Sequence, residues 1–146
     1  MNTRNPSHPK VLLADDDCSV LEALGAALES EGFSVIRAAD GHAAVENFKD
    51  HLPELVLLDV NMPVKGGWDT FARLKAINPL LPIIIITARY DAFSKAAAAG
   101  VTLMRKPLDI PHLLAAMRGL LAGPVEQRPG LTTRRESSTV KGVTTA

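Results

Sequence analysis

Three aspartates carry the chemistry that this sequence makes possible. Asp15 and Asp16 follow the apolar run VLLA, and Asp59 follows the apolar run LVLL. Short runs of Val and Leu are typical of strands that are buried on both faces of a parallel sheet. The carboxyl ends of parallel strands meet at one edge of the sheet, which is where α/β proteins bind ligands. We therefore expect these three carboxylates to lie close together.

Carboxylates that share one crevice repel one another. Two unit charges about 4 Å apart cost on the order of 4 kcal/mol at an effective dielectric constant of 20. A surface salt bridge contributes only about 0–1 kcal/mol and does not offset that cost. The cluster therefore requires either a hard divalent cation or raised carboxyl pKa values.

Length and composition favour one ordinary globular domain. The chain has 146 residues, of which 47% are hydrophobic, and its 16 Lys and Arg balance its 16 Asp and Glu, so no net charge favours nucleic acid or anionic lipid. A single Cys excludes an internal disulfide. The first residues lack the apolar core of a signal peptide, and the apolar stretch Pro82–Ala88 is too short to span a bilayer. We expect a soluble, cytoplasmic protein.

Apolar runs with strand character alternate along the chain with segments of helical periodicity. The expected strands are Lys10–Ala14, Ser34–Ala38, Leu55–Leu58, Ile83–Ile86 and Val101–Arg105. The first expected helix begins after a cap at Asp16 or Asp17 and ends at Gly32. The next three cover Ala43–Asp50, Trp68–Asn78 and Asp91–Ala99, and the last follows a cap at Asp109. This alternation predicts a doubly wound (βα)5 fold, an α/β architecture with a parallel five-stranded sheet and helices on both faces.

The residues that end the strands suggest a strand order. The first, third, fourth and fifth strands end at Asp15–Asp16, Asp59, Thr87 and Lys106, whereas the second ends at Ala38–Ala39, which offers no chemistry. The order 2-1-3-4-5 would gather the reactive ends around one crevice, with the carboxylates at its switch point. The sequence alone does not fix that order.

The domain boundaries follow from composition. Residues 1–9 are polar and read as a flexible lead-in, residues 10–123 hold all the expected strands and helices, and residues 124–146 are rich in Pro, Gly, Ser, Thr and Arg. A segment of that composition cannot bury a core, so we predict a disordered tail.

Four short motifs together resemble one family. They are LLADDD, LLDVNMPVKGG, IITA and MRKP, and they occur in the family's order and near its spacing over about Lys10–Ala122. The chain resembles the response-regulator receiver domain of two-component signalling, with a flavodoxin-like fold, and it resembles a stand-alone receiver. The resemblance implies a phosphoprotein of the phosphorelay class.

The resemblance also implies roles for the acidic residues. Asp59 corresponds to the residue that accepts a phosphoryl group from a histidine kinase or a histidine phosphotransfer protein. Asp15, Asp16, Asp59 and the backbone carbonyl of Asn61 correspond to the protein ligands of Mg²⁺ or Mn²⁺. Carboxylate and carbonyl oxygens suit such hard cations, and an aspartate can serve as a covalent acceptor.

The remaining implied roles concern the later strands. Thr87 and Lys106 correspond to the hydroxyl and the ammonium group that bind the phosphoryl group, and the bond Lys106–Pro107 corresponds to one that is cis in the family. Receivers commonly carry Tyr or Phe where this chain has Leu103. We therefore expect phosphorylation to shift the family's signalling face weakly or by another route.

The leading interpretation is Mg²⁺-dependent acceptance of a phosphoryl group on Asp59, which switches a face that binds an output protein of unknown identity. Self-catalysed transfer and hydrolysis do not make such a protein an enzyme in the usual sense. We expect no direct contact with nucleic acid or membrane, and a monomer or a weak dimer. One alternative is a docking module that keeps the fold without phosphorylation. Another is a phosphatase with an Asp nucleophile, but such enzymes need a second Asp where this chain has Asn61.

Overall fold

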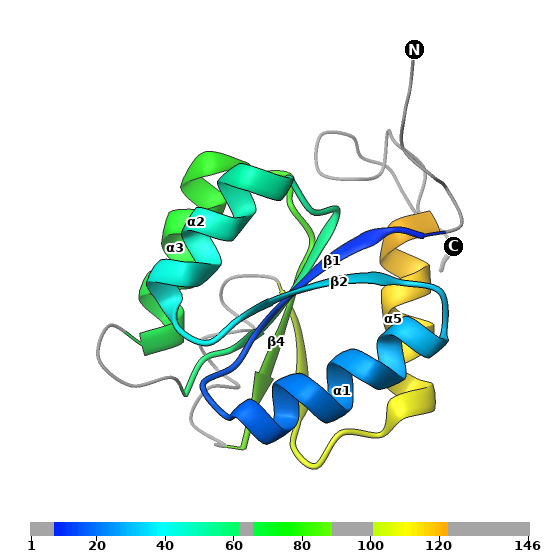
Figure 1. The fold of residues 1–146 in the computed structure, drawn as a ribbon. Coiled ribbons are helices and arrows are strands. Elements are labelled where there is room, and N and C mark those ends of the chain that lie inside the picture. The colour runs from blue at the N-terminus through cyan, green and yellow to red at the C-terminus, as the bar shows by residue number, and fades with distance from the viewer. Residues whose placement is uncertain (1–7, 62–65, 89–100, 123–146) are drawn as a thin grey trace.

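A computed structural model describes residues 8–61, 66–88 and 101–122. These residues form a five-stranded parallel sheet of order β2-β1-β3-β4-β5 (Figure 1). The order expected from the strand ends is confirmed. The expected helix at 91–99, the tail, and the lead-in apart from residues 8–9 lie outside the described residues. The strands are β1 (Lys10–Ala14), β2 (Ser34–Ala38), β3 (Leu55–Asp59), β4 (Ile83–Thr87) and β5 (Thr102–Arg105).

Helices cover both faces of the sheet. Figure 1 shows α1 and α5 packed on one face and α2 and α3 on the other. Alternate residues of each strand serve the two sides, so that Val11 and Leu13 belong to the apolar cluster under α1 and α5, whereas Leu12 and Ala14 belong to the cluster under α2 and α3. The helices are α1 (Cys18–Ser30), α2 (Gly41–His51), α3 (Gly66–Ile77) and α5 (Ile110–Ala122).

The two central strands end one residue later than the sequence pattern indicated. Asp59 is the last residue of β3 and pairs with Ile86, and Thr87 is the last residue of β4 and pairs with Arg105. Every residue of β3 and β4 is buried. The sheet ladder therefore fixes the backbones of the two polar residues that end these strands.

Acidic caps start α1 and α2. Asp17 accepts hydrogen bonds from the backbone N–H groups of Ser19 (2.8 Å) and Val20 (3.4 Å), as an N-cap residue should. Asp40 accepts one from Ala43 N at 2.7 Å. Because Asp40 caps it, α2 begins at Gly41, two positions before the start that hydrophobic periodicity indicated.

The chain adopts a left-handed backbone conformation after both α1 and α2. Gly32 has a φ of 97° just after α1, a left-handed conformation that glycine adopts without strain. The C-cap residue of α2, Leu52, is also left-handed, with a φ of 51°. The apolar stripe of α5 is buried at Leu113 and Met117, whereas Leu120 and Leu121 near its C-terminal end are only partly buried against the same cluster.

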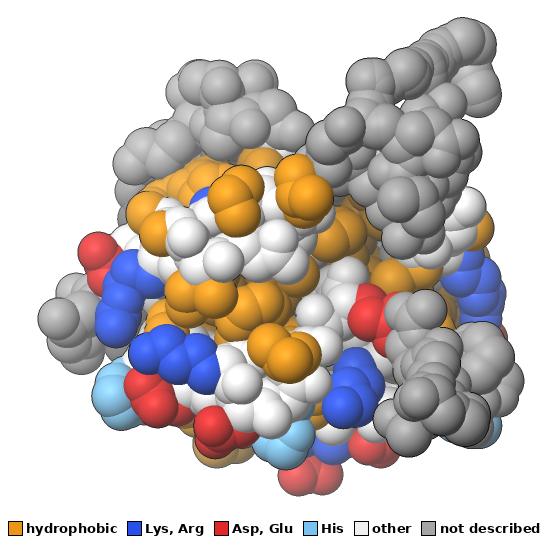
Figure 2. Space-filling model, turned by 90° about the horizontal axis from the view of Figure 1, so that it is seen from above, with side chains coloured by type: hydrophobic (Ala, Val, Ile, Leu, Met, Phe, Trp, Pro, Cys, Tyr) orange, Lys and Arg blue, Asp and Glu red, His pale blue; other side chains and the backbone are white. Residues whose placement is uncertain are grey.

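The end of the molecule opposite the carboxyl ends of the strands carries exposed apolar side chains. Figure 2 shows hydrophobic side chains on this face, with many of the charged side chains near its border. The C-terminal ends of α2 and α3 point toward it in Figure 1. Leu52, Ile77 and Leu80 are the large exposed hydrophobic residues within the described ranges. None of the helices in the described part of the chain has the length and apolar character needed to cross a membrane.

Gly67 fixes how α3 approaches the end of β3. Its N–H donates to the carbonyl of Val60 at 3.2 Å. A Cβ atom at this position would overlap Val60 Cα and would lie 2.7 Å from Asp59 O and 2.8 Å from Val60 C, all of them backbone atoms. Only glycine allows this approach, so Gly67 helps to set the path of the chain that leaves β3.

Alanine substitution at two glycines tests this contact. Gly67 and Gly119 both lie in helices, where Ala is intrinsically favoured by about 0.5–1 kcal/mol. A Cβ at Gly119 meets nothing within 4 Å. We expect Gly119→Ala to stabilise the protein by up to about 1 kcal/mol, and Gly67→Ala to destabilise it by about 1–3 kcal/mol through overpacking. Urea unfolding measures both, and equal stabilisation by the two substitutions would contradict the assignment.

Candidate functional site

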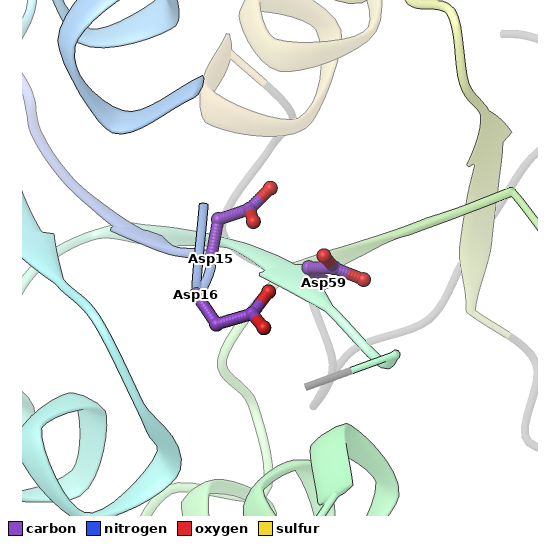
Figure 3. A group of neighbouring side chains, drawn as sticks. All are labelled: Asp15, Asp16 and Asp59. Carbon is purple, nitrogen blue, oxygen red and sulfur yellow. The ribbon is translucent and has the colours of Figure 1, made fainter. Parts of the chain in front are cut away.

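Asp15, Asp16 and Asp59 lie together at the carboxyl edge of the sheet. One oxygen from each lies within 4.8 Å of the other two. In Figure 3 Asp15 and Asp16 project from the chain just after β1, and Asp59 projects from the end of β3. Asp15 is 1% exposed and Asp59 is 3% exposed, whereas Asp16 is exposed. The proximity expected from the strand ends is therefore present, with two buried carboxylates and one that reaches solvent.

The ammonium group of Lys106 bridges the two buried carboxylates. Lys106 Nζ donates to Asp15 Oδ2 at 3.0 Å and to Asp59 Oδ2 at 3.1 Å. The lysine lies directly after β5, and its backbone N–H donates to the carbonyl of Thr87 at 2.9 Å, which ties it to the end of β4. The following Lys106–Pro107 peptide bond is cis. Residues that are 47 and 91 positions apart from Lys106 thus meet in one ion-pair network.

Backbone N–H groups hold the second oxygen of each buried carboxylate. Asp15 Oδ1 accepts from Asp17 N at 2.9 Å, and Asp59 Oδ1 accepts from Asn61 N at 2.8 Å. In both cases the donor follows the aspartate by two residues, so each side chain closes a local turn. These contacts fix the orientation of both carboxylates.

Burial and pairing act in opposite directions on the ionisation of this site. Burial raises the pKa of Asp59 above its ordinary value, and Asp15 nearby adds to the rise, although the Asn61 N–H and the Lys106 ammonium oppose it. Burial also tends to lower the pKa of Lys106, but its hydrogen bonds to Asp15 and Asp59 outweigh burial and raise that pKa. Lys106 is therefore a cation at neutral pH, and it lies beside the Asp59 carboxylate, whose charge is poorly solvated.

Thr87 joins the site through a side-chain contact that the sequence did not reveal. Its side chain is fully buried, and Asn61 Nδ2 donates to Thr87 Oγ1 at 3.0 Å. The family resemblance implied a role only for the backbone carbonyl of Asn61, as a metal ligand. Leu103, which stands where the family carries an aromatic residue, lies in β5 opposite Ile85 and is partly buried against the α2–α3 side of the core. Leucine offers no hydrogen bond to any of these groups.

The sequence analysis also missed the contribution of Gly67. The sequence pattern predicted a helix that begins at Trp68, but the structure places Gly66 and Gly67 in the first turn of α3. The signal available in the sequence was the glycine itself, since glycine is unfavourable inside a helix unless close packing requires it.

The donor set suits a small hard cation. Carboxylate oxygens from three aspartates supply the ligands that Mg²⁺ and Mn²⁺ prefer, and the exposed side of Asp16 leaves room for water ligands. The cluster could hold such an ion. Lys106 provides the remaining positive charge, and Thr87 provides a hydroxyl group at the same edge of the sheet.

The raised pKa of Asp59 predicts a pH-dependent effect of its neutral analogue. The folded state binds the proton of Asp59 more tightly than the unfolded state does, because the pKa of Asp59 is raised on folding. Ionisation of Asp59 therefore lowers the free energy of unfolding at pH values above the ordinary carboxyl pKa. We expect Asp59→Asn in metal-free buffer to be more stable than the wild type at pH 7. The difference should shrink as the pH falls and vanish below the ordinary carboxyl pKa of about 3.9.

Thermal unfolding between pH 3 and pH 8 measures this difference, with about 4 °C expected for each kcal/mol. Asp50→Asn removes an exposed carboxylate from α2 and serves as the matched control, with an expected change below about 0.5 kcal/mol. Lower stability of Asp59→Asn at pH 7, with the difference vanishing at low pH, would mean that the Lys106 ion pair outweighs the cost of burial.

Comparison with known proteins gives a consistent assignment. The sequence profile of the response regulator receiver domain matches residues 11–118. The chain is 33% identical over 137 residues to the transcriptional regulatory protein PrrA of Mycobacterium leprae, which covers 92% of this chain and 57% of that protein. It is 36% identical over 115 residues to the response regulator MprA of a Mycobacterium species, covering 77% of this chain and 50% of that protein. The chain thus spans about half the length of these curated relatives.

Solved structures of response-regulator proteins share this fold. A response regulator receiver domain from Clostridium thermocellum superposes with a TM-score of 0.73 at 26% identity, covering 77% of this chain and 94% of that one. A chain of the CheX–CheY–BeF3–Mg²⁺ complex from Borrelia burgdorferi superposes with a TM-score of 0.72 at 28% identity, covering 79% and 90%. With the strand order, the gathered strand ends and the match over residues 11–118, these likenesses show that the chain belongs to the response regulator receiver domain family of two-component phosphorelay signalling.

Proposed function

We propose that this domain accepts a phosphoryl group on Asp59, with Mg²⁺ bound by Asp15, Asp16, Asp59 and the backbone carbonyl of Asn61. The donor is a histidine kinase or a histidine phosphotransfer protein. The observation that carries the proposal is the convergence of the acidic cluster with Lys106, whose ammonium group lies 3.1 Å from Asp59 Oδ2.

The covalent step is a displacement at phosphorus. A carboxylate oxygen of Asp59 forms a new O–P bond, the N–P bond to the donor histidine breaks, and its electron pair stays on the imidazole nitrogen, which takes up a proton. Phosphoryl transfer needs positioning and charge neutralisation more than covalent assistance. A bound Mg²⁺ would supply charge neutralisation for the phosphoryl oxygens.

The residues of this chain supply the positioning. The Asn61 N–H holds Asp59 Oδ1, and β3 holds the Asp59 backbone, so the acceptor presents a fixed carboxylate. A phosphoryl group adds about −1.5 to −2 charges. Lys106 is a cation within hydrogen-bonding distance of the acceptor, and Thr87 brings a hydroxyl group to the same edge, so both are suited to bind the phosphoryl oxygens.

Phosphorylation would also affect how the domain binds an output protein. The added charge would bias a face of the domain toward an output protein, which the family's role in signalling supports. The names of the relatives describe transcriptional regulation, but this chain matches only about half their length, so the output of this protein stays open. Several properties stay predictions. They are a stand-alone domain, a cytoplasmic location, no direct contact with nucleic acid or membrane, and a monomeric or weakly dimeric state. The lack of enzymatic turnover other than self-catalysed transfer and hydrolysis also stays a prediction.

Intact-mass spectrometry after incubation with acetyl phosphate and Mg²⁺ tests the acceptor. We expect the wild type to gain one phosphate and Asp59→Ala to gain none, because Asp59 is the only carboxylate held by both the Asn61 N–H and Lys106 in the described residues. Asp50→Asn, altered on the exposed face of α2, is the matched control and should be phosphorylated like the wild type. A phosphate on Asp59→Ala would point to another acceptor, and none on the wild type would favour the non-phosphorylated docking module.

Titration with Mg²⁺ tests the metal ligands separately. We expect Asp15→Asn and Asp16→Asn each to weaken Mg²⁺ binding about tenfold or more, since each removes one charged oxygen ligand. Asp17→Asn is the matched control from the same DDD run, because Asp17 caps α1 and Asn is an equally good cap. Isothermal titration calorimetry gives the affinities. Equal weakening by all three substitutions would indicate general charge attraction in place of a defined site.

A further inference from the structure

The backbone of Thr87 is fixed by its neighbours on two sides. It is the last residue of β4, it pairs with Arg105 of β5, and its carbonyl accepts from Lys106 N at 2.9 Å. Its side chain is fully buried. The sheet therefore fixes the position from which the Thr87 hydroxyl group projects.

The backbone of Asn61 is fixed as well. Its N–H donates to Asp59 Oδ1 at 2.8 Å. The preceding residue, Val60, donates its N–H to Ile86 O and accepts from Gly67 N, both at 3.2 Å. From this fixed position the amide group of Asn61 reaches Thr87 Oγ1 at 3.0 Å. One residue thus contacts the acceptor carboxylate through its backbone and the threonine hydroxyl through its side chain.

The Asn61 amide contacts the oxygen of the Thr87 hydroxyl group and not its proton. A threonine hydroxyl has one proton and two acceptor lone pairs, and the Asn61 amide donates to one of the lone pairs. The proton itself takes no part in that bond. Donation to the oxygen also polarises the O–H group, which strengthens any hydrogen bond that the proton makes to an anion. The amide therefore holds the Thr87 oxygen in place and strengthens a hydrogen bond from its proton to an anionic oxygen.

We propose that Asn61 is a positioning residue that orients the Thr87 hydroxyl for a phosphoryl oxygen on Asp59. The inference rests on the proposed function and assigns the Asn61 side chain a role apart from its backbone carbonyl. It links Asp59 to Thr87 through one residue and does not involve Leu103 of β5. The link depends on the state of Asp59, since the same residue donates its N–H to the acceptor carboxylate.

A double-mutant cycle with beryllium trifluoride as the phosphoryl mimic tests the role of Asn61. Affinities are measured by ¹⁹F NMR for the wild type, Asn61→Ala, Thr87→Val and the double variant, with Mg²⁺ saturating for each protein according to its own titration. Loss of one hydrogen bond should weaken binding of the mimic about three- to tenfold in Asn61→Ala. Thr87→Val, which keeps the shape and loses the hydroxyl, should weaken binding at least as much.

The double variant decides whether Asn61 acts through Thr87. If it does, the double variant binds the mimic as Thr87→Val does, because Asn61 then has no hydroxyl to orient. Asn47→Ala is the matched control, since it removes an asparagine side chain that hydrogen-bonds within α2 to Ala43 O, and it should bind like the wild type. A purely structural loss at position 61 would weaken binding in the Thr87→Val background too.

Three outcomes overturn the inference in different ways. Asn61→Ala that binds the mimic as tightly as the wild type would show that the amide has no role in binding. Additive losses in the double variant would show that Asn61 acts independently of Thr87. A wild type that binds no mimic would overturn the proposed function itself, and the inference with it, and is distinguished from the other two because it concerns the unaltered protein.

Discussion

The contact of the Lys106 ammonium group with Asp15 and Asp59 is the interaction on which the site depends. It joins the ends of β1, β3 and β5 with hydrogen bonds of 3.0 and 3.1 Å. Two buried carboxylates and the exposed Asp16 would otherwise repel one another with little solvent to screen them. Removing charges from water is costly, and a buried ion pair offsets that cost only when its geometry is good and its remaining oxygens are satisfied. The N–H groups of Asp17 and Asn61 satisfy those oxygens.

The apolar sheet makes this concentration of charge possible. β3 and β4 are buried along their whole length, and clusters of aliphatic side chains cover both faces. Apolar burial, at about 25 cal/mol per Å², is the favourable term that allows a functional site to hold groups that disfavour folding. Because Asp59 and Thr87 are the last residues of those strands, the register of the sheet and not a loop sets the distance between them.

The segment that follows Asp59 connects the end of β3 to β4 and to α3. Val60 is bonded to β4 on one side and to Gly67 of α3 on the other, and Asn61 extends from there to Thr87. The close approach of Gly67 and the amide of Asn61 thus belong to one arrangement, in which backbone contacts fix the position of a side chain. Asn61 thereby forms a physical connection between Asp59 and Thr87 that does not involve Leu103.

The sequence by itself determined the class of fold and the residue types at the carboxyl edge, because aliphatic runs that alternate with helical periodicity can bury both faces only as a covered parallel sheet. It also narrowed the cap of α1 to Asp16 or Asp17, of which the structure shows Asp17, and it predicted that Gly32 ends the helix, since caps and left-handed turns depend on local chemistry. Only the tertiary structure decided which oxygen each donor binds, that Gly67 must lack a side chain, and that the Asn61 amide reaches Thr87, 26 positions away. Those contacts join residues from different strands and helices, and their geometry depends on sheet register and helix packing, which no local pattern in the sequence encodes.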